Sequence, residues 1–139
     1  MLFNVAADLA LERIEAQTDI DRQVRLARML FITVIPGQDA VYALKLSEAE
    51  LIAADPLQGA GVSEGETPNL SAEAAEHGVS RFEKAAEILT RDQHWKVGAQ
   101  MIEALRRSAK ASLAAAKTAP EIRAAADIDW RAVRAFAQT

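Results

Sequence analysis

The sequence contains no cysteine, and this absence excludes disulfide bonds, thiolate metal sites and catalysis by a thiol. Aromatic residues are also scarce, at 5% of the 139 residues, and much of the 50% that is hydrophobic is alanine. Alanine favours helices and lets them approach closely, but each alanine buries little apolar area. We therefore expect a thin core, which neighbouring subunits would help to stabilise.

Long hydrophobic runs are missing too. No stretch approaches the roughly 18 apolar residues that a membrane-spanning helix needs. The first ten residues include Asp8 and have neither a basic start nor a continuous apolar core, so they do not resemble a signal peptide. We expect a soluble protein that is synthesised in the cytoplasm and has no membrane partner.

Residue combinations that carry catalysis are equally scarce. The two histidines, His77 and His94, lie on separate predicted helices and lack the spacing of metal ligands. The glycines of segment 59–61 follow no strand and precede no Lys-Ser/Thr pair, so they do not form a phosphate loop. The serines have no nucleophile-elbow context. We predict a protein that is not an enzyme, with no catalytic residue, no cofactor and no metal site.

The longest element that the pattern predicts is a helix over residues 80–117. It contains no proline, and its apolar residues recur three or four positions apart. Ser80 and Glu83 form a capping box at its start, and Thr118-Ala119-Pro120 ends it. An unbroken helix of this length would extend for roughly 55 Å, more than the width of a globular domain of this size. We therefore expect it to have helical partners.

A first helix is predicted over about residues 2–34. A second N-cap pattern near Gln17 and Thr18 could divide this segment into two helices. We favour one long helix with a possible kink at that point. Residues 30–35 are interpreted as its apolar last turn rather than as a short strand, because no second strand is available to pair with them. Pro36-Gly37 would end the helix.

The rest of the pattern is also helical. It predicts a helix over 39–54 that Asp55-Pro56 ends, followed by a glycine-rich surface loop over 57–68. A short helix over 69–77 should end at Gly78. After the long helix, a Thr118–Glu121 capping box should open a short helix to Ala126, and Asp127 or Asp129 should cap a last helix. The predicted fold is all-α, with long helices packed as an extended bundle or hairpin and with short C-terminal helices. We predict one domain over 1–139, divided into N-terminal helices (1–54), a loop (55–68) and the remaining helices (69–139).

Charge is unevenly distributed along the chain. Residues 1–78 carry five Lys or Arg against thirteen Asp or Glu, a net charge of −8, whereas residues 79–139 carry eleven against seven, a net charge of +4. The simplest interpretation is that the acidic half folds onto the basic half of the same chain or of the next subunit. A nucleic-acid surface is a second and less favoured interpretation.

The strongest cluster of positive charge consists of Arg106, Arg107 and Lys110. Cations suit the second half of a helix, where they complement its dipole, and Glu103 is placed to pair with either arginine. The cluster could instead contact another protein. Nucleic-acid binding is the least favoured interpretation, because no aromatic residues are interleaved with these cations.

Segment 92–95 interrupts the apolar face of the long helix, either as a polar layer that sets the register between helices or as a solvated turn. Trp95 is a candidate anchor at a subunit contact, because large aromatic side chains dominate interfaces and the surrounding residues are mostly small. The predicted protein interface consists of six residues: Tyr42, Trp95, Ile102, Arg106, Arg107 and Lys110.

Several short motifs follow one another in a characteristic order. They are Arg28 with Phe31-Ile32-Thr33, Gly37-Gln38, Tyr42 to Lys45, Glu48-Ala49, Asp55-Pro56, Leu70, Ala72-Glu73-Ala74 with Gly78, Trp95, and Ile102 to Arg107 with Lys110. This order resembles that of a group of small proteins encoded among the tail genes of tailed bacteriophages and prophages. The resemblance covers roughly residues 20–126.

The resemblance implies a structural component of a phage virion, located in the tail, baseplate or tail-fibre region after synthesis in the host cytoplasm. Its partners would be other tail, baseplate or fibre proteins and further copies of itself in a homo-oligomer. A non-virion chaperone for tail or tail-fibre assembly is the alternative. A nucleic-acid-associated helical regulatory protein is a remote alternative.

Overall fold

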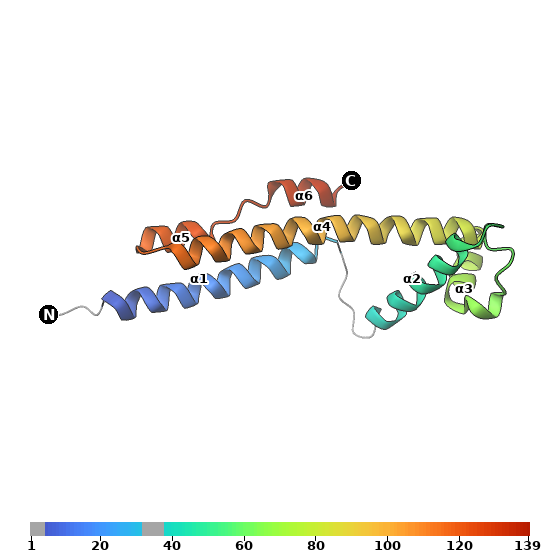
Figure 1. Ribbon diagram of the computed structural model, residues 1–139, viewed down its shortest axis with the longest axis horizontal. Coiled ribbons are helices and arrows are strands. Elements are labelled where there is room, and N and C mark those ends of the chain that lie inside the picture. The colour runs from blue at the N-terminus through green and yellow to red at the C-terminus, as the bar shows by residue number, and fades with distance from the viewer. Residues whose placement is uncertain (1–4, 32–37) are drawn as a thin grey trace. The chain divides into compact units, whose positions relative to one another are not determined.

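The computed structural model describes residues 5–31 and 38–139, and these residues form helices joined by turns (Figure 1). The elements are α1 (Val5–Arg28), α2 (Gln38–Ala54), the 3-10 helix η1 (Glu64–Glu66), α3 (Pro68–His77), α4 (Arg81–Ala115), α5 (Ala119–Ala126) and α6 (Arg131–Ala137). No strand occurs in either described range. The predicted all-α fold, with long helices and short C-terminal helices, is confirmed. None of the described helices is long and apolar enough to cross a membrane.

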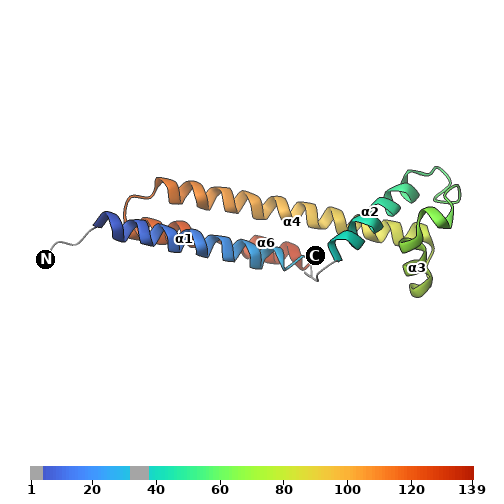
Figure 2. The same cartoon turned by 90° about the horizontal axis from the view of Figure 1, so that it is seen from below.

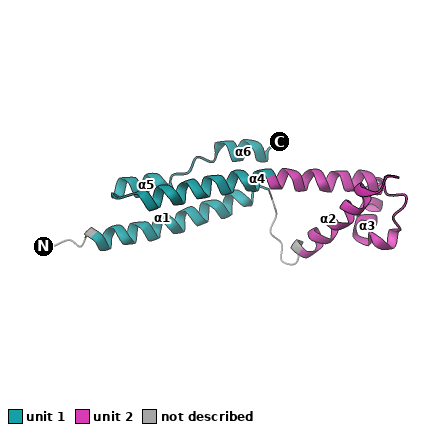
Figure 3. Cartoon of the chain, viewed as in Figure 1, with its two compact units in different colours: residues 1–33, 97–139 teal, residues 34–96 magenta. Residues whose placement is uncertain are grey.

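The chain divides into two compact units (Figure 3). Unit 1 comprises Met1–Thr33 and Val97–Thr139, and unit 2 comprises Val34–Lys96. Helix α4 contributes its first half to unit 2 and its second half to unit 1. Each unit is described separately below, because each has its own group of buried apolar residues.

Helix α1 runs without a break through Gln17 and Thr18. The N-cap pattern at this point does not start a new helix, because the Asp19 carboxylate accepts hydrogen bonds from Arg22 and Gln23 within the same helix. After Arg28 the chain continues in a turn to Phe31, so the helix ends before the apolar 30–35 segment. The remaining part of that segment and the predicted stop at Pro36-Gly37 lie outside the described residues.

The core of unit 1 forms where α1, the second half of α4 and α5 run alongside one another (Figures 1 and 2). Ile20 and Val24 of α1, Ile102 of α4 and Ile122 of α5 are each 3% exposed or less. Leu113 of α4 is buried with them, and alanines fill most of the other inner positions of this core: Ala16, Ala27, Ala109, Ala116, Ala125 and Ala126. The core is therefore as thin as the composition predicts, with a few large aliphatic side chains between alanine faces.

Polar groups tie α1 to the end of α4 and to α5. The guanidinium of Arg13 donates to the backbone carbonyl of Leu113 at 2.6 Å and to that of Ala116. Leu113 lies in the last turn of α4 and Ala116 follows the end of the helix, and the Leu113 carbonyl also accepts from the Ala116 amide at 3.3 Å. Lys110 pairs with Asp21 at 2.8 Å and Arg123 with Glu12 at 3.4 Å. In unit 1 the acidic half of the sequence thus folds onto the basic half of the same chain.

The first of the short C-terminal helices, α5, begins after Thr118, where the sequence predicts. The Thr118 hydroxyl accepts from the Glu121 amide at 3.3 Å, while the Glu121 carboxylate accepts from the Lys117 amide at 3.0 Å, one residue before the partner that a capping box uses. The N-cap of the last helix, α6, is Trp130 rather than the predicted Asp127 or Asp129, because the helix begins only at Arg131. The Asp129 carboxylate accepts from the Arg131 amide at 3.0 Å from a position before the cap. Helix α6 is further fixed by Phe136, whose ring centroid lies 6.0 Å from that of Phe31.

Unit 2 packs α2 and α3 against the first half of α4 around Ala49, Ile52, Leu70, Ala85 and Ile88. Helix α3 ends at Gly78, whose φ of 66° is the left-handed conformation that glycine adopts without strain, as predicted. Ser80 then caps α4 by accepting from the Glu83 amide at 3.0 Å. Local hydrogen bonds of the kind that the sequence predicts therefore set both of these boundaries.

The glycine-rich loop over 57–68 is fastened by a single side chain of α4. The guanidinium of Arg81 donates to the carbonyls of Gly59 and Val62, at 2.8 and 2.7 Å, and to the Thr67 hydroxyl at 3.0 Å. Thr67 is completely buried, and Gly59 is buried as well. The predicted surface loop is thus held closely to the unit 2 core by Arg81.

Candidate interaction surface

The structure places the six predicted interface residues in both units. Tyr42 on α2 and Trp95 on α4 belong to unit 2, and the other four, Ile102, Arg106, Arg107 and Lys110, belong to the unit 1 part of α4. The prediction listed them together as one protein interface. They are better considered as two groups, each within its own unit.

Tyr42 connects α2 to α4 through a buried acid. Its hydroxyl donates to Asp92 Oδ1 at 2.9 Å, and the second oxygen of Asp92 accepts from Lys96 Nζ at 2.8 Å. Asp92 is 6% exposed, whereas the next residue, Gln93, is exposed. Partial burial of the phenol and its contact with the Asp92 carboxylate raise the pKa of Tyr42 to about 12. Asp92 therefore forms a polar contact between helices, which is one of the two roles that the sequence suggested for this segment.

Ile102 is 1% exposed and lies in the core of unit 1. In this structure its side chain packs against α1 and stabilises the unit, so it offers no surface to another chain. Ile102 was included in the predicted interface because of its helical spacing. The same spacing that would place a residue at a contact between subunits also places it in the core of its own chain. Sequence periodicity alone does not distinguish the two.

The basic cluster is largely engaged within the chain. Arg106 donates two hydrogen bonds to the Glu103 carboxylate, at 2.9 and 2.6 Å, which lowers the pKa of Glu103 below its ordinary value. Lys110 reaches Asp21 of α1. Arg107 is exposed, and its positive charge contributes to the lowered pKa of Glu103. The intramolecular interpretation of this cluster therefore accounts for Arg106 and Lys110.

One polar cluster was not predicted from the sequence. Lys84 is only 1% exposed, and its ammonium lies 2.6 Å from His77 Nδ1, 2.9 Å from Glu87 and 3.7 Å from Glu73. Glu73 also accepts from Lys45 at 2.8 Å, a contact that lowers the pKa of Glu73.

The position of Lys84 in the helical pattern could have suggested its burial. It lies four residues before Ile88 and eight before Asp92, on the face of α4 that is buried in unit 2. Its charge is satisfied by two carboxylates and a histidine, the arrangement that a buried ammonium requires. These contacts link α3 to α4, and they leave no free nucleophile or base.

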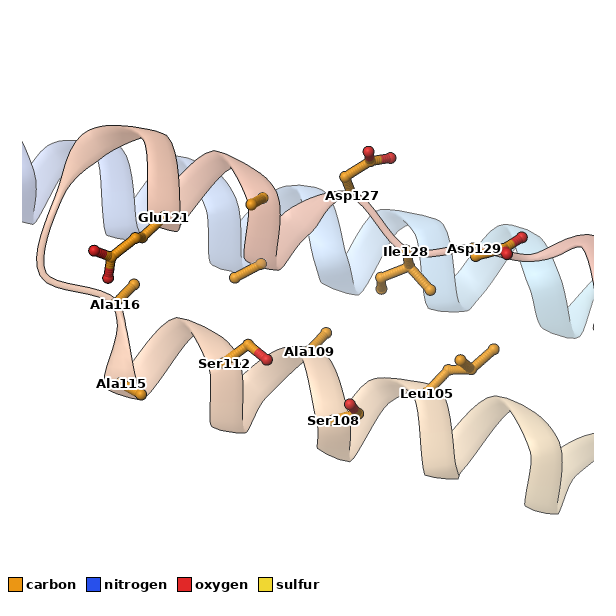
Figure 4. A pocket seen from close by; sticks show the side chains of 12 residues that line it. Leu105, Ser108, Ala109, Ser112, Ala115, Ala116, Glu121, Asp127, Ile128 and Asp129 are labelled. Atoms are coloured by element: carbon orange, nitrogen blue, oxygen red, sulfur yellow. The ribbon is translucent and has the colours of Figure 1, made fainter.

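A groove of about 510 Å³ lies between the second half of α4, α5 and the segment after it (Figure 4). Small side chains of Ser108, Ala109 and Ser112 form its floor on α4. The acids along the opposite side are already used in part: Glu121 accepts from a backbone amide, and Asp129 pairs with Arg131. Ser108 and Ser112 line the floor of the groove beneath these acids.

The largest feature that sequence reasoning missed is the number of apolar side chains on outward-facing positions of α1 and α2. Three such side chains on α1 and two in the turn that follows it are 47–63% exposed: Leu11, Ile14 and Leu26 on the helix, and Met29 and Leu30 in the turn. On α2 three aliphatic side chains are 43–55% exposed: Val41, Leu44 and Leu51. The sequence was interpreted only for the apolar face of each helix that packs inward. The solvent-facing side of a helix is normally polar, and these apolar residues depart from that pattern.

Metal-binding groups of three or more acidic or histidine side chains are absent from residues 5–31 and 38–139. Comparisons of this chain with protein-family models, with curated protein sequences and with solved structures found no match. The assignment of a function therefore depends on the surfaces described above.

Proposed function

We propose that this chain is an assembly protein that acts through helix-mediated contacts with other copies of itself and with partner proteins. The observation that supports this proposal is the exposed apolar side chains on the outer faces of α1 and α2. Single exposed aliphatic residues are normal on protein surfaces, but recurring ones along two helices are typical of a face that another helix covers.

The polar groups of the chain favour this proposal over a chemical activity. The buried lysine, the buried acid at position 92 and the basic residues Arg106 and Lys110 are each paired within their own unit. These polar groups are already engaged within the chain, whereas the exposed aliphatic side chains of α1 and α2 remain accessible to another helix.

The biological setting that we propose is the tail, baseplate or tail-fibre region of a tailed bacteriophage. This part of the proposal is supported by the ordered motifs between residues 20 and 126 that resemble phage tail-gene products. The partners would be other tail, baseplate or fibre proteins. The proposed location is the virion tail, after synthesis in the host cytoplasm.

The experiment that tests the setting is quantitative mass spectrometry of gradient-banded particles from the phage or induced prophage that encodes the chain. A constant ratio to the major tail protein across independent preparations would support a virion component. A chain that is abundant in the infected cell but absent from washed particles would instead indicate the non-virion assembly chaperone. Intact particles that form normally after deletion of the coding sequence would overturn both.

Nucleic-acid binding has little support in the structure. Arg106 and Lys110 are bound to Glu103 and Asp21, and the chain carries a net charge of −4. A protein that binds the phosphate backbone loses affinity steeply as salt concentration rises. Binding to duplex DNA whose affinity falls steeply with rising salt concentration would support the nucleic-acid alternative.

A further inference from the structure

One side of unit 1, formed by the end of α1 and the second half of α4, carries a concentration of positive charge. The two helices run side by side in opposite directions there (Figures 1 and 2), and Asp21 of α1 pairs with Lys110 of α4 at 2.8 Å. Two turns further along α1, the charge of Arg28 contributes to the lowered pKa of Glu103, which lies two turns back along α4. The side chains between these two pairs complete a surface that we call the basic face: Asp21, Arg25, Arg28, Glu103, Arg106, Arg107 and Lys110.

The basic face has more positive charge than its own acids neutralise. Its two carboxylates are already taken, because Asp21 accepts from Lys110 and Glu103 accepts two hydrogen bonds from Arg106. The three remaining arginines are exposed, and none forms an ion pair with an acid of residues 5–31 or 38–139: Arg25, Arg28 and Arg107. The face therefore presents three guanidinium groups without a carboxylate partner in the described part of the chain.

Unit 2 has the opposite imbalance of charge. It carries five Lys or Arg against eleven Asp or Glu, a net charge of −6, whereas unit 1 carries eleven against nine, a net charge of +2. All five cations of unit 2 are engaged inside it, by the 57–68 loop or by carboxylates: Lys45, Arg81, Lys84, Arg91 and Lys96.

The unpaired charge that remains on unit 2 is acidic. Five of its glutamates are exposed and form no ion pair with the residues that the structure describes: Glu50, Glu64, Glu66, Glu76 and Glu83. They are spread over α2, η1, α3 and α4, so the excess of negative charge belongs to the surface of the unit as a whole.

We propose that the basic face of unit 1 binds the acidic surface of unit 2 in a second copy of this chain. This inference rests on the proposed assembly function and names a pair of surfaces that would carry it. A guanidinium group holds a carboxylate through two parallel hydrogen bonds, so unpaired arginines on one surface fit unpaired glutamates on the other. Opposite charges of this kind also steer association and determine which surfaces meet.

Two other occupants of the basic face fit the charges less well. A second basic face would set guanidinium groups against guanidinium groups, and like charges across an interface are unfavourable. A nucleic acid would attract the three arginines, but it would be repelled by unit 2 of the same chain, whose net charge is −6. Unit 2 of a second copy brings carboxylates to the arginines without either repulsion.

The proposed contact joins two different surfaces, so each copy that binds leaves one basic face and one acidic surface open to further copies. We therefore expect association that continues beyond the dimer as the protein concentration rises. Because the charges are exposed, salt should weaken this association. The distance over which such charges interact falls from about 10 Å at 0.1 M salt to about 3 Å at 1 M.

Charge reversal on the basic face tests the contact, with sedimentation equilibrium of the full chain in low salt as the measurement. Arg28→Glu and Arg107→Glu each replace an exposed side chain, so circular dichroism should remain that of the wild type. We expect each variant to raise the dissociation constant by about tenfold or more. Arg107→Lys, which keeps the positive charge, should retain most of the association.

Lys117→Glu is the matched control for the two charge reversals. It makes the same change of net charge at an exposed position outside the basic face, and it should associate like the wild type. An equal loss of association in this control would overturn the inference, because net charge rather than the basic face would then govern association. Unchanged association in both Arg28→Glu and Arg107→Glu would overturn it as well.

A photoreactive benzoylphenylalanine that replaces Ala104 identifies what the basic face contacts. Ala104 is exposed, follows Glu103 and lies one turn before Arg107. Chains that carry the photoreactive group are mixed with an excess of isotopically heavy wild-type chains, irradiated and digested. We expect heavy peptides from residues 34–96 among the cross-linked products, and Arg28→Glu in the photoreactive chain should lower their yield.

Two other cross-linking patterns would overturn the inference. Heavy peptides from residues 1–33 or 97–139 alone would mean that unit 1 meets unit 1. Light peptides from residues 34–96, in the presence of that excess of heavy chains, would mean that unit 2 of the same chain occupies the basic face.

Labelled duplex DNA and the composition of particles separate the remaining outcomes. A wild-type chain that binds the DNA in low salt but does not self-associate would replace the second copy with a polyanion and overturn the inference. A monomeric chain that is present in particles at a constant ratio to the major tail protein would overturn the inference and leave the proposed function standing. Self-association that requires Arg28 and Arg107, in a chain absent from particles, would support the inference and overturn the proposed virion location.

Discussion

The ring of Phe31 lies directly over Gly98 in unit 1. A Cβ atom placed on Gly98 would come within 2.5 Å of Phe31 Cζ and within 2.6 Å of Cε1, both closer than carbon atoms approach in proteins. Gly98 is the only glycine of α4, and it lies in the interior of the helix, where glycine is unfavourable. The close approach of the aromatic ring explains why this residue is a glycine.

The first prediction is that Gly98→Ala destabilises the protein. Alanine gains about 1 kcal/mol of helix propensity over glycine, but overpacking a close contact typically costs about 1 to 3 kcal/mol. The ring cannot move away freely, because it also packs against Phe136. We expect a net loss of about 1 kcal/mol in the free energy of unfolding, measured by urea denaturation.

A double-mutant cycle with Phe31→Leu gives the control for this prediction. In the Phe31→Leu background the ring is gone, so Gly98→Ala should become neutral or stabilising. Equal effects of Gly98→Ala in the two backgrounds would show that the ring does not determine the choice of glycine.

Three helix boundaries could be predicted because each depends on a few neighbouring residues. Ser80 caps α4 through the amide three residues later, and Thr118 caps α5 in the same way. Gly78 ends α3 because glycine adopts a positive φ at low cost. Interactions of this kind are contained in four or five consecutive residues, so the sequence specifies them locally.

Contacts between distant segments could not be predicted in the same way. Phe31 and Gly98 are 67 residues apart, and either could have served another role in its own helix. The apolar spacing of α4 could not show whether Ile102 faces a core or a partner. The exposed aliphatic side chains of α2 were overlooked for a related reason, since apolar residues on two sides of a helix do not indicate which side the rest of the chain covers.

The second prediction concerns Tyr42, the only tyrosine in the chain. Its phenol has a pKa raised from 10 to about 12, because it is partly buried and donates to the Asp92 carboxylate. Because this pKa is higher in the folded state than in the unfolded state, the protonated phenol stabilises the fold, and its contribution is complete below pH 10. The contribution is lost as the pH rises from 10 to about 12.

The near-ultraviolet absorbance of phenolate measures this titration without interference from another tyrosine. We expect a midpoint near 12 in the folded protein and a midpoint near 10 in denaturant. Asp92→Asn, which keeps a hydrogen-bond acceptor but removes the charge, should lower the folded midpoint. A folded midpoint at 10 would contradict the contact between Tyr42 and Asp92.

The third prediction is that Arg81→Lys releases the 57–68 loop. Lysine has three donors on a single nitrogen, whereas the planar guanidinium of Arg81 reaches two carbonyls and a hydroxyl at once. Those buried acceptors would lose their donors, at a cost of about 1 to 3 kcal/mol. Limited proteolysis should detect faster cleavage in the loop.

Arg91→Lys is the matched control for this substitution. Arg91 is on the same helix, but its side chain is 73% exposed and pairs only with Glu87 among the described residues. We expect this variant to be cleaved at the wild-type rate. Equal cleavage of the Arg81 and Arg91 variants would mean that the loop is held without the guanidinium.

The fourth prediction is a loss of stability in acid that depends on Lys45. The pKa of Glu73 is lowered mainly by the hydrogen bond from Lys45, which lies 2.8 Å away. A carboxyl whose pKa is lowered by folding stabilises the fold above its unfolded value of 4.5, and this contribution is lost as the pH falls below that value. Both side chains are about a quarter exposed, so we expect a contribution of only about 0.5 to 1 kcal/mol.

Comparison of the wild type with Lys45→Gln at pH 7 and well below pH 4.5 tests this prediction. The variant should be less stable than the wild type at pH 7, and the difference should shrink in acid, because protonated Glu73 gains little from the ammonium. Lys117→Gln, at an exposed position, should change stability little at either pH. A difference between wild type and Lys45→Gln that stays constant across this range would show that Lys45 stabilises unit 2 by packing alone rather than through its charge on Glu73.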